Sequence, residues 1–536
     1  MTAEPDLISL LYHADWRQLS LSAEVNDGSA LLIAPGRRYR LQTPDYLTGC
    51  DGDRPWKLCQ DDAEDEDEGT VRWFSGPEPP LRSLLCPAWL LKSSRLEVTG
   101  HVSVLGRDAL QVVATREQGL RGTKGPDRFR VGRTEALVDA ELGILLRLAR
   151  TDGTEEDGGA GHGSAGDSGE RSGVIELVSL DLSPVIDPAQ FAPPPGCLIG
   201  ESLGESLGGG GLPGQTVKTI AGLAAGALGA WIRYSPSGHR QPPDITEAAI
   251  PPEDPAPEPS PDGWPSGPQV SDEILHLLHG SGAARLPGGG ATGFAATRHV
   301  WLDIGAMLSR IPPAARRAGF GGLGLLADSI AEQPSASHLV SAVRIWGPGQ
   351  YQVDFRSKPR DGATRIVCDG QRRWRVYRDK VTVGPAEPAP GNLGYLTDPS
   401  WLLECRLSGG EQVTAGDRPA FRINVARGDA QWSVPLMFPA TVAVVDAELG
   451  VLLRLTSYLG GKPVQRDGLQ DITLEPGGFR ADIPSDLPVS EEDRPSERAG
   501  RNSVNIPLTV ARVVAQQAAT GAAQAARNIL RRFDSR

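Results

Sequence analysis

The chain has 536 residues, of which 39% are hydrophobic and 23% are charged, a composition that is ordinary for a globular protein of about three or four domains. Its formal net charge of -13 at pH 7 argues against a face that binds nucleic acid or an anionic membrane surface. The 65 glycines and 45 prolines predict long loops or linkers. None of the six cysteines lies in a Cys-x-x-Cys pair, which argues against zinc ribbons and thioredoxin-type redox chemistry.

The sequence shows no pattern typical of a targeting or membrane-spanning segment. Residues 1–6 lack the positive charge and the apolar run of a signal peptide. The longest apolar run, residues 220–232, is shorter than the roughly 20 residues that a spanning helix needs. We therefore expect a reduced, cytoplasmic protein without stable membrane insertion.

The chain opens with a predicted helix and a set of short strands. Residues 6–14 have the spacing of a short amphipathic helix, and the alternating runs 19–25 and 29–41 predict strands. Cys50-Asp51-Gly52 predicts a tight turn. The acidic run 61–68 is best explained as a solvated loop, with a metal site as the alternative.

Longer strands are predicted in the next part of the chain. Residues 87–91 predict a short helix or turn, and 95–106, 109–116 and 129–138 predict successive antiparallel strands. Residues 174–182 are expected to close the sheet. This region therefore belongs to one mostly antiparallel sheet.

One stretch of this region occurs twice in the chain. Residues 138–148 (VDAELGILLRL) recur as residues 445–455 (VDAELGVLLRL), and a single conservative change separates them. Aspartate can cap a turn, glycine can supply a left-handed position, and a β-rich run follows, so each copy predicts a hairpin. A match of this quality across roughly 300 residues indicates internal duplication.

Other features recur in the same order, which extends the duplication to most of the chain. The matching pairs are residues 7–12 with 274–279, 39–41 with 351–353, 50–52 with 368–370, 87–91 with 399–403, and 107–109 with 418–420. Two units of the same kind, each a many-stranded sheet with an opening helix, therefore make up the protein. We predict the fold class α+β.

We expect five segments along the chain. They are a β domain at 1–198, a Gly-rich tether and Ala/Gly-rich helix at 199–235, a Pro-rich disordered linker at 236–270, a second β domain at 271–490 with a helical insertion at about 281–336, and a C-terminal Ala-rich helix at 491–536. The helices at 217–234 and 508–533 carry small residues that permit close packing. Each could cover its own sheet, pair with the other helix, or dock on a partner.

The order of these motifs resembles the LolA/RseB/LppX-like fold of lipoprotein-carrier and lipoprotein-sorting proteins. The motifs that carry the resemblance are PGRRYRL (35–41), the turn at 50–52, GRDAL (106–110), the repeated VDAELG and SLDLSPVIDPAQFAPPPG (179–196). The resemblance implies two tandem curved antiparallel sheets, or half-barrels, each covered by helices around an apolar cavity that accepts lipid chains. The chain lacks the signal peptide and lipobox cysteine of that family, so an intracellular relative that binds acyl or other apolar ligands is implied.

Four tryptophans are the candidates for lining such a cavity, because they recur in both copies. They are Trp56, Trp89, Trp374 and Trp401. Core packing is the alternative for all four, and it is the safer interpretation.

Several motifs suggest chemistry, and each has a simpler explanation. G-x-S-x-G at 200–204 and 204–208 and G-x-G-x-x-G at 209–214 lack the preceding strand that a nucleophile elbow or a dinucleotide site requires, so we expect a flexible tether there. His276 and His279 have the spacing of a metal-binding pair, but no carboxylate is suitably placed in the sequence nearby.

The carboxylate pairs of the repeated hairpin are the remaining candidates for chemistry. Asp139 with Glu141, and Asp446 with Glu448, could perform acid–base work. Turn capping by aspartate and a solvated glutamate explain them more simply.

The function that we predict is non-enzymatic binding of an apolar ligand, a lipid or acyl group, between sheet and helices. The alternative is a protein-interaction or regulatory scaffold whose cavities are filled by its own helices. A hydrolase is the poorest interpretation. We expect no cofactor, no metal and no nucleic-acid partner.

Overall fold

The computed structural model describes most of both predicted units. The described residues are 6–59, 83–116, 132–152, 174–199, 267–280, 292–303, 336–386, 393–426, 440–476 and 479–491, apart from 53, 93, 348, 356–363, 460, 480–482 and 485. We call 6–199 the first half and 267–491 the second half.

The first half forms one antiparallel sheet with the spatial order β11-β5-β4-β3-β2-β1-β10-β9-β8-β7-β6. Its strands are β1 (Leu21–Val25), β2 (Ala30–Ala34), β3 (Arg38–Gln42), β4 (Tyr46–Asp51), β5 (Pro55–Cys59), β6 (Ser94–Val104), β7 (Arg107–Arg116), β8 (Gly132–Asp139), β9 (Leu145–Asp152), β10 (Val174–Asp181) and β11 (Leu198–Ile199). The short early strands and the long later strands meet where β1 pairs with β10.

The second half forms a sheet with the order β18-β19-β20-β21-β22-β12-β13-β14-β15-β16-β17-β23. Its strands are β12 (Thr292–Asp303), β13 (Ala336–Gly347), β14 (Gln350–Phe355), β15 (Arg365–Asp369), β16 (Arg372–Val376), β17 (Val381–Pro385), β18 (Arg406–Ala415), β19 (Arg418–Ala426), β20 (Ala440–Asp446), β21 (Leu452–Leu459), β22 (Lys462–Pro476) and β23 (Val489–Glu491). The pairing of β17 with β23 is parallel, unlike the other strand pairs of this sheet.

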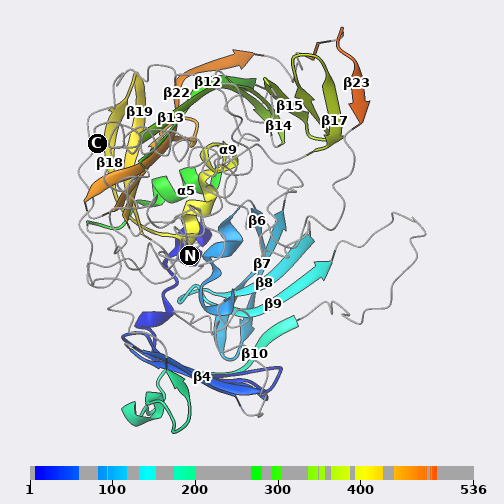
Figure 1. The fold of residues 1–536 in the computed structure, drawn as a ribbon. Helices are drawn as coiled ribbons and strands as arrows, with labels where there is room; N and C mark the ends of the chain where they lie inside the picture. The colour runs from blue at the N-terminus through cyan, green and yellow to red at the C-terminus, as the bar shows by residue number, and fades with distance from the viewer. Residues whose placement is uncertain are drawn as a thin grey trace, which may run out of the picture.

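The two sheets repeat one strand order, and both are curved (Figure 1). In each half the long late strands lie on one side and the early strands on the other, and β10 and β22 join them to β1 and β12. The prediction of an α+β fold with two curved antiparallel sheets is confirmed. β10 was expected to close its sheet, whereas it lies in the middle of it, between β9 and β1.

One strand corrects the helical insertion that was predicted for the second half. β12 lies inside the range 281–336 that was predicted to be a helical insertion, and it takes the place in the second sheet that β1 takes in the first. It pairs with β13 and β22 along nearly its whole length. A buried arginine, Arg298, interrupts its apolar alternation, which explains why the sequence pattern did not predict a strand.

Short helices lie between the two sheets (Figure 1). They are α1 (Leu7–His13), η1 (Trp16–Gln18), η2 (Pro87–Leu91), α5 (Asp272–Gly280), α9 (Leu393–Thr397) and η7 (Pro399–Glu404), and η4 (Pro188–Phe191) packs near β3 and β4 of the first sheet. The helix predicted at 6–14 and the short helix or turn predicted at 87–91 are confirmed as helices, and their counterparts at 274–279 and 399–403 are helical as well. The helices predicted at 217–234 and 508–533 fall outside the described residues.

The core is one continuous hydrophobic cluster that contains residues of both halves. Leu11 of α1, Leu91 of η2, Leu278 of α5 and Leu402 of η7 are all fully buried in it. Burial of such side chains stabilises a fold by about 1.5–3 kcal/mol each, so these short helices contribute strongly to the core. Within the described ranges, no helix is long and apolar enough to cross a membrane.

Candidate functional site

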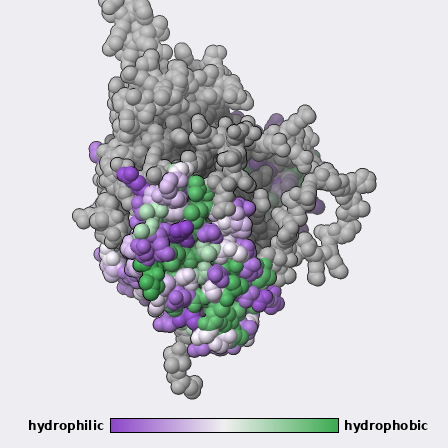
Figure 2. Space-filling model, turned by 90° about the horizontal axis from the view of Figure 1, so that it is seen from below, coloured by the Kyte–Doolittle hydropathy of each residue, from purple (hydrophilic) through white to green (hydrophobic). Residues whose placement is uncertain are grey.

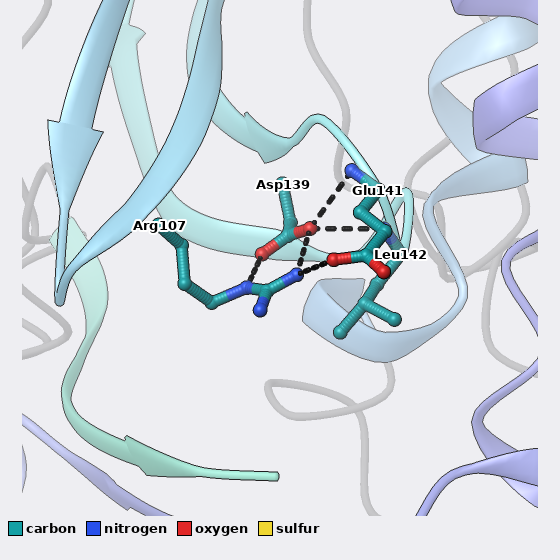
Figure 3. Close-up of polar contacts among 4 residues, drawn as sticks. All are labelled: Arg107, Asp139, Glu141 and Leu142. Atoms are coloured by element: carbon teal, nitrogen blue, oxygen red, sulfur yellow. Dashed lines mark hydrogen bonds and ion pairs between the residues drawn. The ribbon is translucent and has the colours of Figure 1, made fainter.

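The repeated hairpin contains a compact cluster of charged side chains (Figure 3). Asp139 is fully buried at the end of β8 and accepts hydrogen bonds from the backbone amides of Glu141 and Leu142, at 3.0 and 2.9 Å. The guanidinium of Arg107 on β7 donates through Nη2 to Asp139 Oδ1 at 3.0 Å and through Nε to Oδ2. Its Nη2 also contacts Glu141 Oε2 at 2.9 Å.

The second copy builds the same cluster. Asp446 accepts from the amides of Glu448 and Leu449 at 2.9 and 2.7 Å. Arg418 on β19 donates from Nη2 to Asp446 at 3.2 Å and to Glu448 at 2.9 Å, and from Nε to Asp446. The duplication therefore preserves the side-chain geometry as well as the sequence.

The electrostatics of this cluster favour a structural role over acid–base chemistry. Burial raises the pKa of Asp139, but hydrogen bonds from Arg107 and from two backbone amides outweigh it, so the net pKa lies below the usual 3.8. The same carboxylate raises the pKa of Arg107. A general acid or base at neutral pH needs a pKa near 7, and this pair is held ionised instead.

Turn capping by aspartate was predicted and is confirmed in both copies. Glu141 was predicted to be only solvated, whereas it also binds Arg107. Arg107 and Arg418 were not predicted as members of the cluster. The signal was present, because both recur at the same position of the repeat, before the hairpin.

Gly143 completes the hairpin and seats it on the opening helix. It adopts a left-handed φ of 71°, and a Cβ placed there would lie 2.3 Å from the carbonyl oxygen of Leu10. Glycine is therefore required both by the backbone conformation and by the close approach to α1. The repeated motif works as a platform that positions the opening helix of the first half.

The predicted cavity tryptophans occupy two kinds of site. Trp56 on β5 is fully buried and donates from its indole nitrogen to the carbonyl of Phe191 at 2.9 Å. Its ring fits because Gly49 lacks a side chain, since a Cβ there would lie 2.4 Å from the ring. Trp374, at the equivalent place on β16, is half-buried and is flanked by Val367 and Val383.

Trp89 and Trp401 lie in the equivalent helices η2 and η7. Each indole nitrogen donates to the carbonyl six residues earlier, Ser83 or Tyr395, at 3.0 Å in both cases. Trp401 is fully buried and Trp89 is half-buried. This geometry agrees with core packing, and the assignment of the four tryptophans to a ligand cavity stays a prediction.

The two histidines with the spacing of a metal-binding pair contact different partners. His276 Nε2 lies 2.6 Å from Asp6 Oδ2, and His279 Nδ1 lies 2.9 Å from the carbonyl oxygen of Leu91. Both contacts join the second half to the first. Among the described residues, no group of three or more histidine, cysteine and acidic side chains is placed to hold a metal.

Tyr12 makes the corresponding contact from the first half. Its buried hydroxyl donates to the carbonyl of Cys405 at 3.3 Å and accepts from the amide of Leu407 at 2.9 Å. Burial is the largest cause of the raised pKa of Tyr12, so the hydroxyl stays protonated. We call the region formed by α1, η2, α5 and η7 the junction.

Replacing Tyr12 with phenylalanine is expected to lower the free energy of unfolding by about 1–3 kcal/mol, because it leaves the buried amide of Leu407 without its hydroxyl partner. Urea-induced unfolding followed by tryptophan fluorescence measures the change. Tyr377→Phe, on a half-buried tyrosine that follows β16, is the control. An effect no larger than that of the control would show that this bridge adds nothing to stability.

The serine- and glycine-rich motifs at 200–214 and the acidic run at 61–68 lie outside the described residues. They stay predictions from the sequence.

No protein-family model and no curated protein matches this chain, but solved structures do. A conserved protein from Thermus thermophilus is 12% identical, with 41% of this chain and 98% of that chain covered and a TM-score of 0.23. MucB in complex with MucA is 11% identical, with coverages of 88% and 98% and a TM-score of 0.21.

A LolA superfamily protein from Nitrosomonas europaea is 8% identical, with 39% of this chain and 94% of that chain covered and a TM-score of 0.18. At these identities and TM-scores the matches add nothing about ligands or activity. The chain is similar to LolA superfamily proteins and MucB among the solved structures, and this is the kind of resemblance that its motifs predicted.

Proposed function

We propose that this chain is a non-enzymatic binding protein that acts as a protein-interaction scaffold. The observation that carries the proposal is the junction, where helices of both halves occupy the space between the sheets. Leu11, Leu91, Leu278 and Leu402 have an exposed fraction of 0% there. A carrier protein would keep the space between sheet and helices open for its ligand. In a scaffold protein, side chains of the protein itself can fill that space as part of the hydrophobic core.

The outer surface supports the same proposal. The described part of the face in Figure 2 intersperses hydrophobic with hydrophilic side chains. Val174 and Val178 of β10 are 40% and 52% exposed. Because these two exposed valines share one face of β10, we propose that a protein partner contacts the outer face of the first sheet.

Binding of an apolar ligand is the second candidate, and the continuity of the core favours it. The apolar side chains of both sheets and of the junction form one cluster. Outward movement of the helices would expose the apolar side chains that they cover. The four tryptophans Trp56, Trp89, Trp374 and Trp401 remain its proposed lining.

Native mass spectrometry of the protein purified from its own cells, before and after mild delipidation, tests both candidates. The scaffold proposal expects the mass of the chain alone in both samples. It also expects that Val174→Asp with Val178→Asp abolishes chemical cross-links between β10 and a protein partner, while Val185→Asp, beyond the strand, preserves them. One or two co-purifying apolar molecules per chain, lost on delipidation, would instead establish the carrier function.

A further inference from the structure

The junction is built from two equivalent pairs of elements. Residues 7–12 of α1 correspond to 274–279 of α5, and η2 corresponds to η7 in the repeat. α1 packs against α5, and η2 packs against η7. Each element therefore meets its own counterpart from the other half, which is the arrangement of a two-fold symmetric dimer interface.

Polar contacts also cross the junction in both directions, each from an opening helix to the end of the facing short helix. Tyr12 and His279 are equivalent positions of the opening helices. Tyr12 contacts the carbonyl of Cys405, just after η7, and His279 contacts the carbonyl of Leu91, at the end of η2. In an isologous interface residue i contacts j and j contacts i. The two halves follow this rule at the level of the elements, since the acceptor carbonyls of Leu91 and Cys405 lie two positions apart in the repeat.

A charged pair joins the two halves within this arrangement. Lys92 and Glu404 directly follow the equivalent residues Leu91 and Leu403, so they occupy the same position of the repeat. Lys92 Nζ lies 3.4 Å from Glu404 Oε1, and the side chains are only 13% and 5% exposed. Two copies of the first half would bring lysine against lysine here, and two copies of the second half would bring glutamate against glutamate.

We infer that the junction is a heterotypic interface in which Lys92 and Glu404 select the other half of the same chain as the partner and reject a second copy of the same half. Like charges at a buried contact disfavour a wrong partner, and opposite charges fix the right one. This inference goes beyond the proposed scaffold function, because it assigns the partner of an internal surface and not that of the outer face.

The test uses the full chain with a protease site inserted in the Pro-rich segment between residues 240 and 260. The folded protein is cleaved, and the association of the two pieces is measured by size-exclusion chromatography and by dilution. We expect the wild-type pieces to stay together as a one-to-one complex. Lys92→Glu and Glu404→Lys each place like charges at the buried contact, and each is expected to weaken association about 10- to 100-fold.

The double variant, Lys92→Glu with Glu404→Lys, restores opposite charges and is expected to recover association to within about threefold of wild type, as coupled charge pairs do. Glu135→Lys, at the exposed pair of Arg133 and Glu135, is the matched control and should leave association unchanged. Wild-type pieces that separate, or a double variant as weak as the single variants or unable to fold, would overturn the inference.

Discussion

Replacing Asp467 with asparagine is expected to lower the free energy of unfolding by about 3–5 kcal/mol, because it removes the carboxylate of a buried ion pair. Arg298 on β12 donates to Asp467 on β22 through Nε at 2.9 Å and through Nη2 at 2.7 Å. The side chains are 6% and 1% exposed. The charge of Arg298 would then stay buried without the bidentate partner that offsets its desolvation.

Urea-induced unfolding of the wild type and the variant measures this change. Glu135→Gln is the matched control, because the pair of Arg133 and Glu135 is more than half exposed and such pairs contribute only about 0–1 kcal/mol. Arg298→Met combined with Asp467→Leu should recover most of the loss, because apolar replacements remove both charges together. Equal losses for Asp467→Asn and the control would contradict the role assigned to the buried pair.

The same ion pair explains why the sequence did not predict β12 as a strand. Phe294, Ala296 and Val300 lie on one face of β12 and predict a strand by alternation, but Arg298 occupies the buried position between them. The carboxylate that neutralises Arg298 lies on β22, far along the chain. No local sequence pattern therefore indicates that the buried charge has a partner. A strand with a charged residue at a buried position can be predicted only when the cross-strand partner of that residue is known.

Local features were predicted well because their causes are local. The helix at 7–13 begins at Asp6, whose side chain accepts from the amide of Ile8 at 3.1 Å. The hairpin turn depends on Asp139 and Gly143, both inside the repeated stretch. Helix capping and turn formation depend on a few neighbouring residues. Because the chain is duplicated, the hairpin pattern occurs twice in the sequence.

The junction could not be predicted from the sequence in the same way. Tyr12 and Leu407 are separated by 395 positions, and the amphipathic pattern of residues 6–14 shows only that one face of the helix is buried. The pattern does not say which surface covers that face. The recurrence of Leu91 and Leu403, followed by lysine in one copy and glutamate in the other, was the available signal, and it becomes informative only once the two positions are known to meet.

Replacing Asp139 with alanine is expected to lower the free energy of unfolding at pH 7 by about 3 kcal/mol, because two backbone amides and Arg107 lose a charged acceptor. The size of this loss should depend on pH. The folded-state pKa of Asp139 lies below its unfolded value near 3.8, so the stabilisation is fully present above that value. It disappears as the pH falls through the folded-state pKa and the carboxylate becomes protonated.

The difference in free energy of unfolding between the wild type and Asp139→Ala should therefore stay constant from pH 8 to about pH 5. It should become smaller below about pH 4. Urea titrations across this range measure it, since the effects of carboxylates that do not contact Arg107 cancel in the difference. Glu141→Ala is the control: its side chain is 80% exposed, so its loss should be small throughout. A gap that widened in acid would mean that Asp139 contributes as a neutral group, and would refute the ion-pair account of the repeated hairpin.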